Sequence, residues 1–284
     1  ISAVDITKEP EFEQQIIDLN DQFIAASFQD HIIAGGLFSF EYNGQNDRRA
    51  VNFFYIKTTF ESGGGLLYRL HQAMNKPYDD TASNSYDLLG IRYAHFQKLS
   101  LDLSYYVPIG KRGKLVYRLA GGVGFPRENF SEALPFEKSF FSGGANGMRA
   151  WRARSLGPGS FLDDDNSYDK IGDLQIEANF EARFPLISWI EGAFFVDAGN
   201  IWLLNDDPLR PGGKFKKDLF LSEIAIGSGL GLRMDFDFFI VRMDLAIPIK
   251  THQYLSMILI ELMVGGYLME IFQTEKNFIN YNLT

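Results

Sequence analysis

A glycine-rich segment near the middle of the chain carries three arginines and a tryptophan. It runs from residue 141 to residue 168 and contains Arg149, Trp151, Arg152 and Arg154. A guanidinium group stays charged and can hold a carboxylate through two parallel hydrogen bonds. Loops longer than about 12–15 residues are usually functional or disordered, and a disordered loop seldom carries such side chains. The segment is therefore a candidate for ion pairing, with a solvated surface loop as the alternative.

Other residue patterns give little support for an enzyme. The sequence has no Cys, and no two of its four histidines have metal-ligand spacing. The G-x-S-x-G, H-E-x-x-H and G-x-x-x-x-G-K-[ST] motifs are missing. Residues 163–166 (DDDN) look like the start of a calcium loop but lack its central Gly and terminal Glu, which favours a solvated acidic loop. We predict no catalytic residues, no metal and no cofactor.

The overall composition argues against two further classes of protein, nucleic-acid binding proteins and helical bundles. Lys and Arg number 27 against 36 Asp and Glu, which gives a formal net charge of −9 without a long basic run. Nucleic-acid binding is therefore not expected. Aromatic residues make up 15% of the chain and glycines number 27. This combination is typical of repeated β-structure and not of a helical bundle.

Apolar and polar residues alternate through several long segments with the period of a β-strand. In residues 175–184, Glu177 and Glu181 lie on the polar face, opposite a face of Ile, Ala and Phe. Similar alternation covers residues 99–107, 224–236 and 238–247, and less regular strands are expected at residues 23–28, 32–42, 50–60, 87–96, 115–125 and 192–202.

The length of these segments favours a membrane barrel. A tilted strand that crosses a bilayer needs about 9–11 residues, and an apolar face opposite a wet polar face is typical of such barrels. Aromatic residues near the expected strand ends would form the interfacial girdles: Tyr105, Tyr106, Phe125, Phe184, Trp189, Trp202, Phe236 and Phe238. Because alternation does not reveal which face points outward, a soluble β-sandwich or lipocalin-like barrel is the alternative. Ten or more long strands would leave hazardous edges unless the sheet closes.

Membrane helices and a leader segment are not predicted. A spanning helix needs roughly 20 mostly apolar residues, and in the best candidate, residues 254–272, Glu261 and Glu270 interrupt the apolar run. The N-terminal residues lack a basic region followed by an apolar core, so we expect a mature or truncated start rather than a signal peptide.

The glycine-rich segment resembles a conserved loop of the BamA/TamA superfamily of outer-membrane assembly barrels. Residues 143–161 read GGANGMRAWRARSLGPGSF, which is similar to the sixth-loop motif of that family. The family usually has an Arg-Gly-aromatic triplet at the centre, and here Ala replaces Gly. The matching positions are Gly143, Gly144, Met148, Arg149, Ala150, Trp151, Arg154, Gly157, Pro158 and Gly159.

A second motif carries the same resemblance. Residues 191–202 (EGAFFVDAGNIW) resemble the F-x-D-x-G strand of the family, and the runs LPFEKSFFSGGAN and EARFPL fit as well. Together these motifs are similar to the TamA-like branch found in Bacteroidota, often called TamL. The likeness is good over about residues 99–249 and loose elsewhere.

The resemblance implies an all-β fold, a transmembrane antiparallel barrel of sixteen strands. The first strand would pair weakly with the last, and the sixth extracellular loop would fold into the lumen. Arg149 would then contact Asp197 on the barrel wall. The alternation agrees, because Asp197 has no place against lipid and must face the lumen. Glu177 and Glu181 face the lumen on the preceding strand and would share the charge of Arg149.

The resemblance also implies a function without covalent chemistry. An integral protein of the bacterial outer membrane would insert β-barrel or surface proteins through a lateral seam. Its partners would be outer-membrane lipid, unfolded client proteins and a TamB-like periplasmic bridging protein. Two alternatives stay open: a two-partner-type secretion pore that exports one dedicated client, and a passive porin or adhesin barrel.

The sequence departs from the family in three ways. Family members carry POTRA domains before the barrel, and none is recognised here. The long strands number about 11 or 12, and the chain stops at Thr284 without the usual terminal aromatic. We therefore expect residues 1–284 to be a fragment that holds the C-terminal transmembrane barrel domain.

Overall fold

The computed structural model describes residues 2–4, 30–45, 52–77, 85–110, 112–130, 133–162, 170–187, 189–236, 238–251, 258–264 and 267–274. The strands are β1 (Ser2–Val4), β2 (His31–Ile33), β3 (Gly35–Asn43), β4 (Phe53–Gly63), β5 (Asp87–Leu88), β6 (Ile91–Arg92), β7 (Phe96–Ile109), β8 (Gly113–Pro126), β9 (Leu174–Ile187), β10 (Ile190–Trp202), β11 (Ala225–Asp235), β12 (Ile240–Lys250), β13 (Ile258–Val264) and β14 (Tyr267–Thr274). The helices are α3 (Gly65–Ala73) and α4 (Phe220–Glu223), with 3-10 turns η1 (Glu128–Phe130) and η2 (Phe136–Lys138).

Ten of these strands form one antiparallel sheet. Their order is β14-β13-β12-β11-β10-β9-β8-β7-β4-β3, so each strand pairs with the next strand of the sheet along the chain. Short hairpins join them at one end, which we call the hairpin end, and longer connections join them at the other, the loop end. The connection between β8 and β9, for example, covers residues 127–173. Within the described residues no pairing joins the edge strands β3 and β14.

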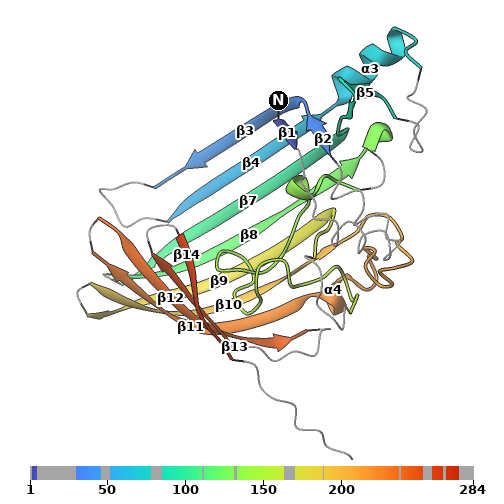
Figure 1. Ribbon diagram of the computed structural model, residues 1–284. Helices are drawn as coiled ribbons and strands as arrows, with labels where there is room; N and C mark the ends of the chain where they lie inside the picture. Colours follow the sequence, from blue (N-terminus) through green and yellow to red (C-terminus); the bar gives the residue numbers. More distant parts are fainter. Residues whose placement is uncertain are drawn as a thin grey trace, which may run out of the picture.

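The sheet curves around the segment that follows β8, which lies on its concave side (Figure 1). The convex face is apolar and open, with large exposed side chains such as Phe194, Leu230 and Leu245. The concave face is polar and covered, and there Asp197 and Asp244 are buried. The apolar face therefore points outward, which is the reverse of a soluble sandwich or lipocalin.

Most of the expected strands are confirmed. Residues 99–107 lie in β7, residues 175–184 in β9 and residues 192–202 in β10. Residues 23–28 lie outside the described part of the chain. The sixteen strands and the closed barrel stay predictions, since ten strands of one open sheet are described.

The expected strand at residues 87–96 is wrong. This region forms the two-residue strands β5 and β6, joined by a turn in which Leu89 and Gly90 have φ of 58° and 81°. Backbone in the left-handed region breaks an extended run. A short β-hairpin therefore replaces the long strand that the apolar residues predicted.

Residues 254–272 contain two strands rather than a helix. β13 and β14 pair with each other, and β13 also pairs with β12. In this register Glu261 is the Cα partner of both Asp244 and Glu270. The acidic residues that interrupt the apolar run thus stand at matching positions of neighbouring strands. Among the described helices, none is long and apolar enough to cross a membrane.

Trp202 is wrong as a member of the interfacial girdle. Its side chain is fully buried, and its ring centroid lies 5.6 Å from those of Phe215 and Phe220. Its Nε1 donates a 2.7 Å hydrogen bond to Oε2 of Glu223. The connection between β10 and β11 folds over the end of β10, which strand alternation does not reveal. Phe184, Trp189, Phe236 and Phe238 remain exposed at the hairpin end.

Candidate functional site

Arg149 lies at the tip of the loop that crosses the concave face. Its Nε and Nη2 donate to Oδ2 and Oδ1 of Asp197 on β10, at 2.8 and 2.7 Å. Its Nη1 donates to Oε2 of Glu181 on β9 at 2.5 Å. The backbone N–H of Arg149 adds a 3.1 Å hydrogen bond to Oδ2 of Asp197. One guanidinium thus joins the loop to two strands.

This ion pair is largely buried. Arg149 is 3% exposed and Asp197 is fully buried, and the guanidinium lies 3.5 Å from the ring centroid of Phe195. Removing such charges from water costs several kcal/mol per ion unless the pairing geometry is excellent. The bidentate contact, the second carboxylate and the aromatic ring together supply that compensation.

Glu181 is the centre of a wider charge network. It accepts hydrogen bonds from Arg149, from Nε of Arg183 at 2.5 Å and from Nη2 of Arg233 at 3.2 Å. Arg233 in turn donates to Oδ1 of Asp244 at 2.6 Å. The charges therefore run without interruption from the loop tip across β9 and β11 to β12.

Glu177 has a different role from the one expected. It accepts a 2.7 Å hydrogen bond from Oγ of Ser142 and lies 3.9 Å from Nη1 of Arg118. Its carboxylate also lies close to Gly147, where an added Cβ would approach Oε2 to 2.8 Å. Glu177 thus supports the loop near its tip, while Asp197 and Glu181 hold Arg149.

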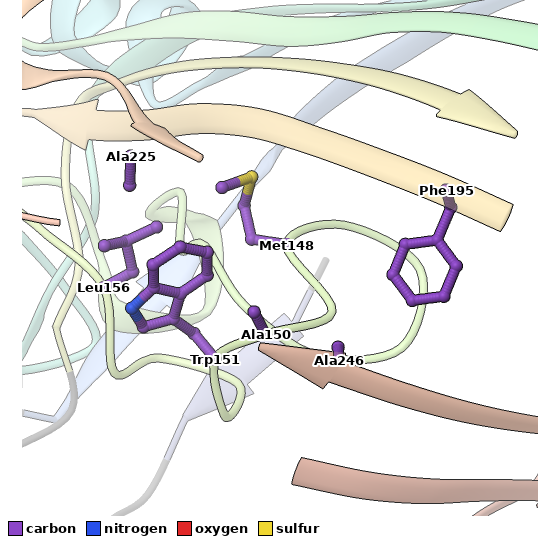
Figure 2. Close-up of a cluster of buried hydrophobic side chains, with 7 residues drawn as sticks. All are labelled: Met148, Ala150, Trp151, Leu156, Phe195, Ala225 and Ala246. Carbon is purple, nitrogen blue, oxygen red and sulfur yellow. The ribbon is translucent and has the colours of Figure 1, made fainter. Parts of the chain in front are cut away.

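Apolar contacts fix the loop beside the ion pair. Met148, Ala150, Trp151 and Leu156 of the loop are buried against one residue from each of β10, β11 and β12, namely Phe195, Ala225 and Ala246 (Figure 2). The Ala that replaces the family's Gly therefore has a packed position. Room for it exists because β11 has Gly227 opposite, where an added Cβ would approach that of Ala150 to 2.7 Å.

The remaining motif residues shape the loop instead of contacting Arg149. Gly143, Gly144, Gly157 and Gly159 have positive φ, and a Cβ on Gly143 would meet the carbonyl of Arg152 at 2.0 Å. Pro158 lies between the last two of these turns. Arg154 packs over Phe136 at 4.4 Å, near the base of the loop. These residues hold the path of the backbone that delivers Arg149.

Several residues of the site were not singled out from the sequence. They are Arg118 on β8, Asn179 and Arg183 on β9, Arg233 on β11, and Arg242 and Asp244 on β12. Each lies on the polar, concave face of its strand. Which of them meet the loop depends on the register between strands, which the sequence does not contain.

A cavity of about 470 Å³ lies beside the loop tip on the side of the hairpin end. Arg118, Arg149, Arg183 and Arg242 line it together with Asp102 and Glu181. Each of these arginines has a carboxylate partner, and the partners of Arg149 and Arg242 that do not line the cavity, Asp197 and Asp244, lie behind it. Within the described residues no three His, Cys, Asp or Glu side chains come together as a metal site.

Two comparisons with known proteins give matches for this chain. A family model described as the Omp85 superfamily domain matches residues 37–259. The chain is also similar to the crystal structure of BamA from Haemophilus ducreyi lacking POTRA domains 1-3, with 15% sequence identity and a TM-score of 0.46. That match covers 80% of this chain and 52% of the other, so the chain spans about half the length of that structure.

Proposed function

Because this chain belongs to the Omp85 superfamily, we propose that it inserts or translocates proteins in the bacterial outer membrane. The observation that carries the proposal is the buried contact of Arg149 with Asp197 and Glu181. This contact holds a long loop against the polar face of a sheet whose apolar face is open.

The resemblance of the loop motif to the TamA-like branch supports assembly as the more specific function. In this proposal Arg149 acts as a strut that keeps the lumen side of the sheet organised while client proteins pass. The clients would be unfolded β-barrel or surface proteins. Outer-membrane lipid and a TamB-like bridging protein would be the other partners.

The lateral seam that the resemblance implies offers a route for insertion. The edge of a strand opened at such a seam carries N–H and C=O groups that can pair with an incoming strand. We propose that clients add to an edge of this kind, and that local thinning of the bilayer beside it lowers the barrier.

Depletion of the protein in its native host, followed by quantitative proteomics of the outer membrane and the medium, tests this function. Assembly predicts that many barrels or surface lipoproteins disappear from the membrane. Loss of one or two proteins from the medium, with an intact membrane proteome, would instead identify a dedicated secretion pore. An unchanged proteome in both fractions would contradict both functions.

A further inference from the structure

The backbone of the loop tip is held from four different strands. The carbonyl of Ala145 accepts a 2.6 Å hydrogen bond from Nη2 of Arg242 on β12. The carbonyl of Asn146 accepts one of 3.0 Å from Nη1 of Arg118 on β8. The next carbonyl, of Gly147, accepts one of 2.8 Å from Nδ2 of Asn179 on β9. The N–H of Arg149 donates to Oδ2 of Asp197 on β10, so the tip is tied to β8, β9, β10 and β12.

Arg118 and Arg242, which stand on the two outermost of these four strands, are themselves held in place. Arg118 makes hydrogen bonds with both carboxylate oxygens of Asp102 on β7, between 2.7 and 3.1 Å. Arg242 donates from Nε to Oδ2 of Asp244 at 2.5 Å. Ordering a long side chain costs rotamer entropy. The ion pairs with Asp102 and Asp244 already order the two arginines, so this cost is not left to the contact with the loop. Each guanidinium therefore presents a donor to the loop from a defined position.

The strands that these arginines occupy are not neighbours. β9, β10 and β11 lie between β8 and β12 in the sheet. Hydrogen bonds within a sheet join adjacent strands only, and the twist from one strand to the next varies over a wide range. Small changes at each pair therefore add up to a large change in curvature. Hydrogen bonds that join β8 to β12 through the loop tip, across the concave face, restrict the total change in curvature between these two strands.

We infer that Arg118 and Arg242 are positioning residues that clamp the loop tip by its backbone and so fix the curvature of the sheet from β8 to β12. The clamp is separate from the Arg149 contact, because Arg118 and Arg242 donate to main-chain carbonyls, with one further 3.4 Å contact from Arg242 to Oδ1 of Asn146. Its consequence for client passage rests on the proposed function. The geometric claim stands apart from that function and can be tested on the purified protein alone.

The chain suits a distance measurement because it has no cysteine. Spin labels are attached at Leu119 on β8 and Leu245 on β12, which are exposed on the convex face, away from the loop. Pulsed electron resonance then reports the distance between the two strands in detergent or lipid. A second label pair, Phe184 on β9 and Phe194 on β10, spans adjacent strands, and the dipolar broadening of its continuous-wave spectrum shows whether the sheet is folded.

The variants are Arg118→Gln, Arg242→Gln and the two combined, with Arg112→Gln as the control. Arg112 lies in the hairpin between β7 and β8 and is exposed, away from the loop tip. We expect the wild type and the control to give one narrow distance between β8 and β12. The double variant should lose that narrow distance, while the adjacent-strand pair stays unchanged.

A narrow and unshifted β8–β12 distance in the double variant would overturn the inference. If the adjacent-strand pair also broadens, the double variant is not folded and the single variants decide. Arg242→Gln retains the Arg118 contact and must still broaden the β8–β12 distance for the inference to hold. Failure here would leave the proposed function untouched, since no client protein takes part in the measurement.

Discussion

Each guanidinium nitrogen of Arg149 donates to a carboxylate, which explains why the loop motif centres on this residue. The sequence was sufficient to suggest Arg149, Asp197 and Glu181 as a group, because a polar face and a motif pointed to them. It was not sufficient for Arg118 and Arg242. Many polar residues line the concave face, and their identity as loop contacts depends on strand register and loop path.

Replacement of Arg149 should be among the most damaging changes in the loop. Arg149→Gln leaves Asp197 and Glu181 buried without their shared cation, and breaking a buried pair costs about 3–5 kcal/mol. The change should appear as a lower unfolding temperature and a lower denaturant midpoint. Arg152→Gln is the matched control, because Arg152 stands in the same loop with an exposed side chain. Equal stability of the two variants would contradict the buried ion pair.

The packing of Ala150 against β11 gives a second prediction at this scale. Gly227→Ala places a Cβ 2.7 Å from that of Ala150 and 3.0 Å from the Trp151 ring, so overpacking should destabilise the protein by about 1–3 kcal/mol. Ala150→Gly in the same chain should recover part of that loss, because it removes one of the two clashes. Thermal unfolding measures both effects. Gly36→Ala is the control and should have little effect, because nothing lies within 4 Å of the added Cβ. If the effects of Gly227→Ala and Ala150→Gly simply add in the double variant, the two residues are not in direct contact.

At the scale of elements, strands were predictable where one face is polar and the other apolar. β9 is the best example, since its polar face contains Glu177, Asn179 and Glu181 in strict alternation. The prediction of strands failed where tertiary contacts determine short elements, as in β5 and β6, where one long strand was expected. The burial of Trp202 was missed for the same reason, because the covering residues belong to a different element.

The loop-end cluster around His95 should respond to acid. His95 lies between β6 and β7, its ring is 5.1 Å from that of Tyr68 on α3, and its Nδ1 is 3.4 Å from Oε2 of Glu128. Burial lowers the pKa of His95 below its usual value, with Arg127 and Arg69 acting in the same direction and Glu128 opposing them. A lowered folded-state pKa means that this contribution to stability is present above about pH 6.5 and is lost as the pH falls through the folded-state value.

Hydrogen exchange of α3 and of residues 93–96 measures that response. After correction for intrinsic rates, protection should fall as the pH is lowered below about 6.5, because the imidazole then takes up a proton more readily in the unfolded state. His95→Phe, which keeps a ring but does not titrate, should remove the pH dependence. Protection that falls equally in this variant would assign the response to another group, for example to His71, whose pKa burial also lowers.

At the scale of the whole molecule, the open apolar face predicts where lipid lies. Leu230 stands midway along β11 with 62% exposure, and its partners across the sheet, Phe194 and Leu245, are also exposed. Leu230→Arg should reduce folding into lipid vesicles, by about 2–4 kcal/mol if this position is near the bilayer midplane. Leu221→Arg is the control, since Leu221 is exposed on α4 at the loop end. Equal folding yields would place Leu230 outside the bilayer.

The central claim is that the contact between Arg149 and Asp197 is needed for the work of the protein in the outer membrane. Complementation of a depleted strain with Arg149→Glu, Asp197→Arg and the pair of changes together tests it most directly, with outer-membrane proteomics as the readout. Both single variants place like charges together and should fail to restore barrel and surface proteins. The combined variant should restore part of them, since the pair is rebuilt although Glu181 now faces a like charge. Single variants that restore the membrane as well as the wild type would contradict the account.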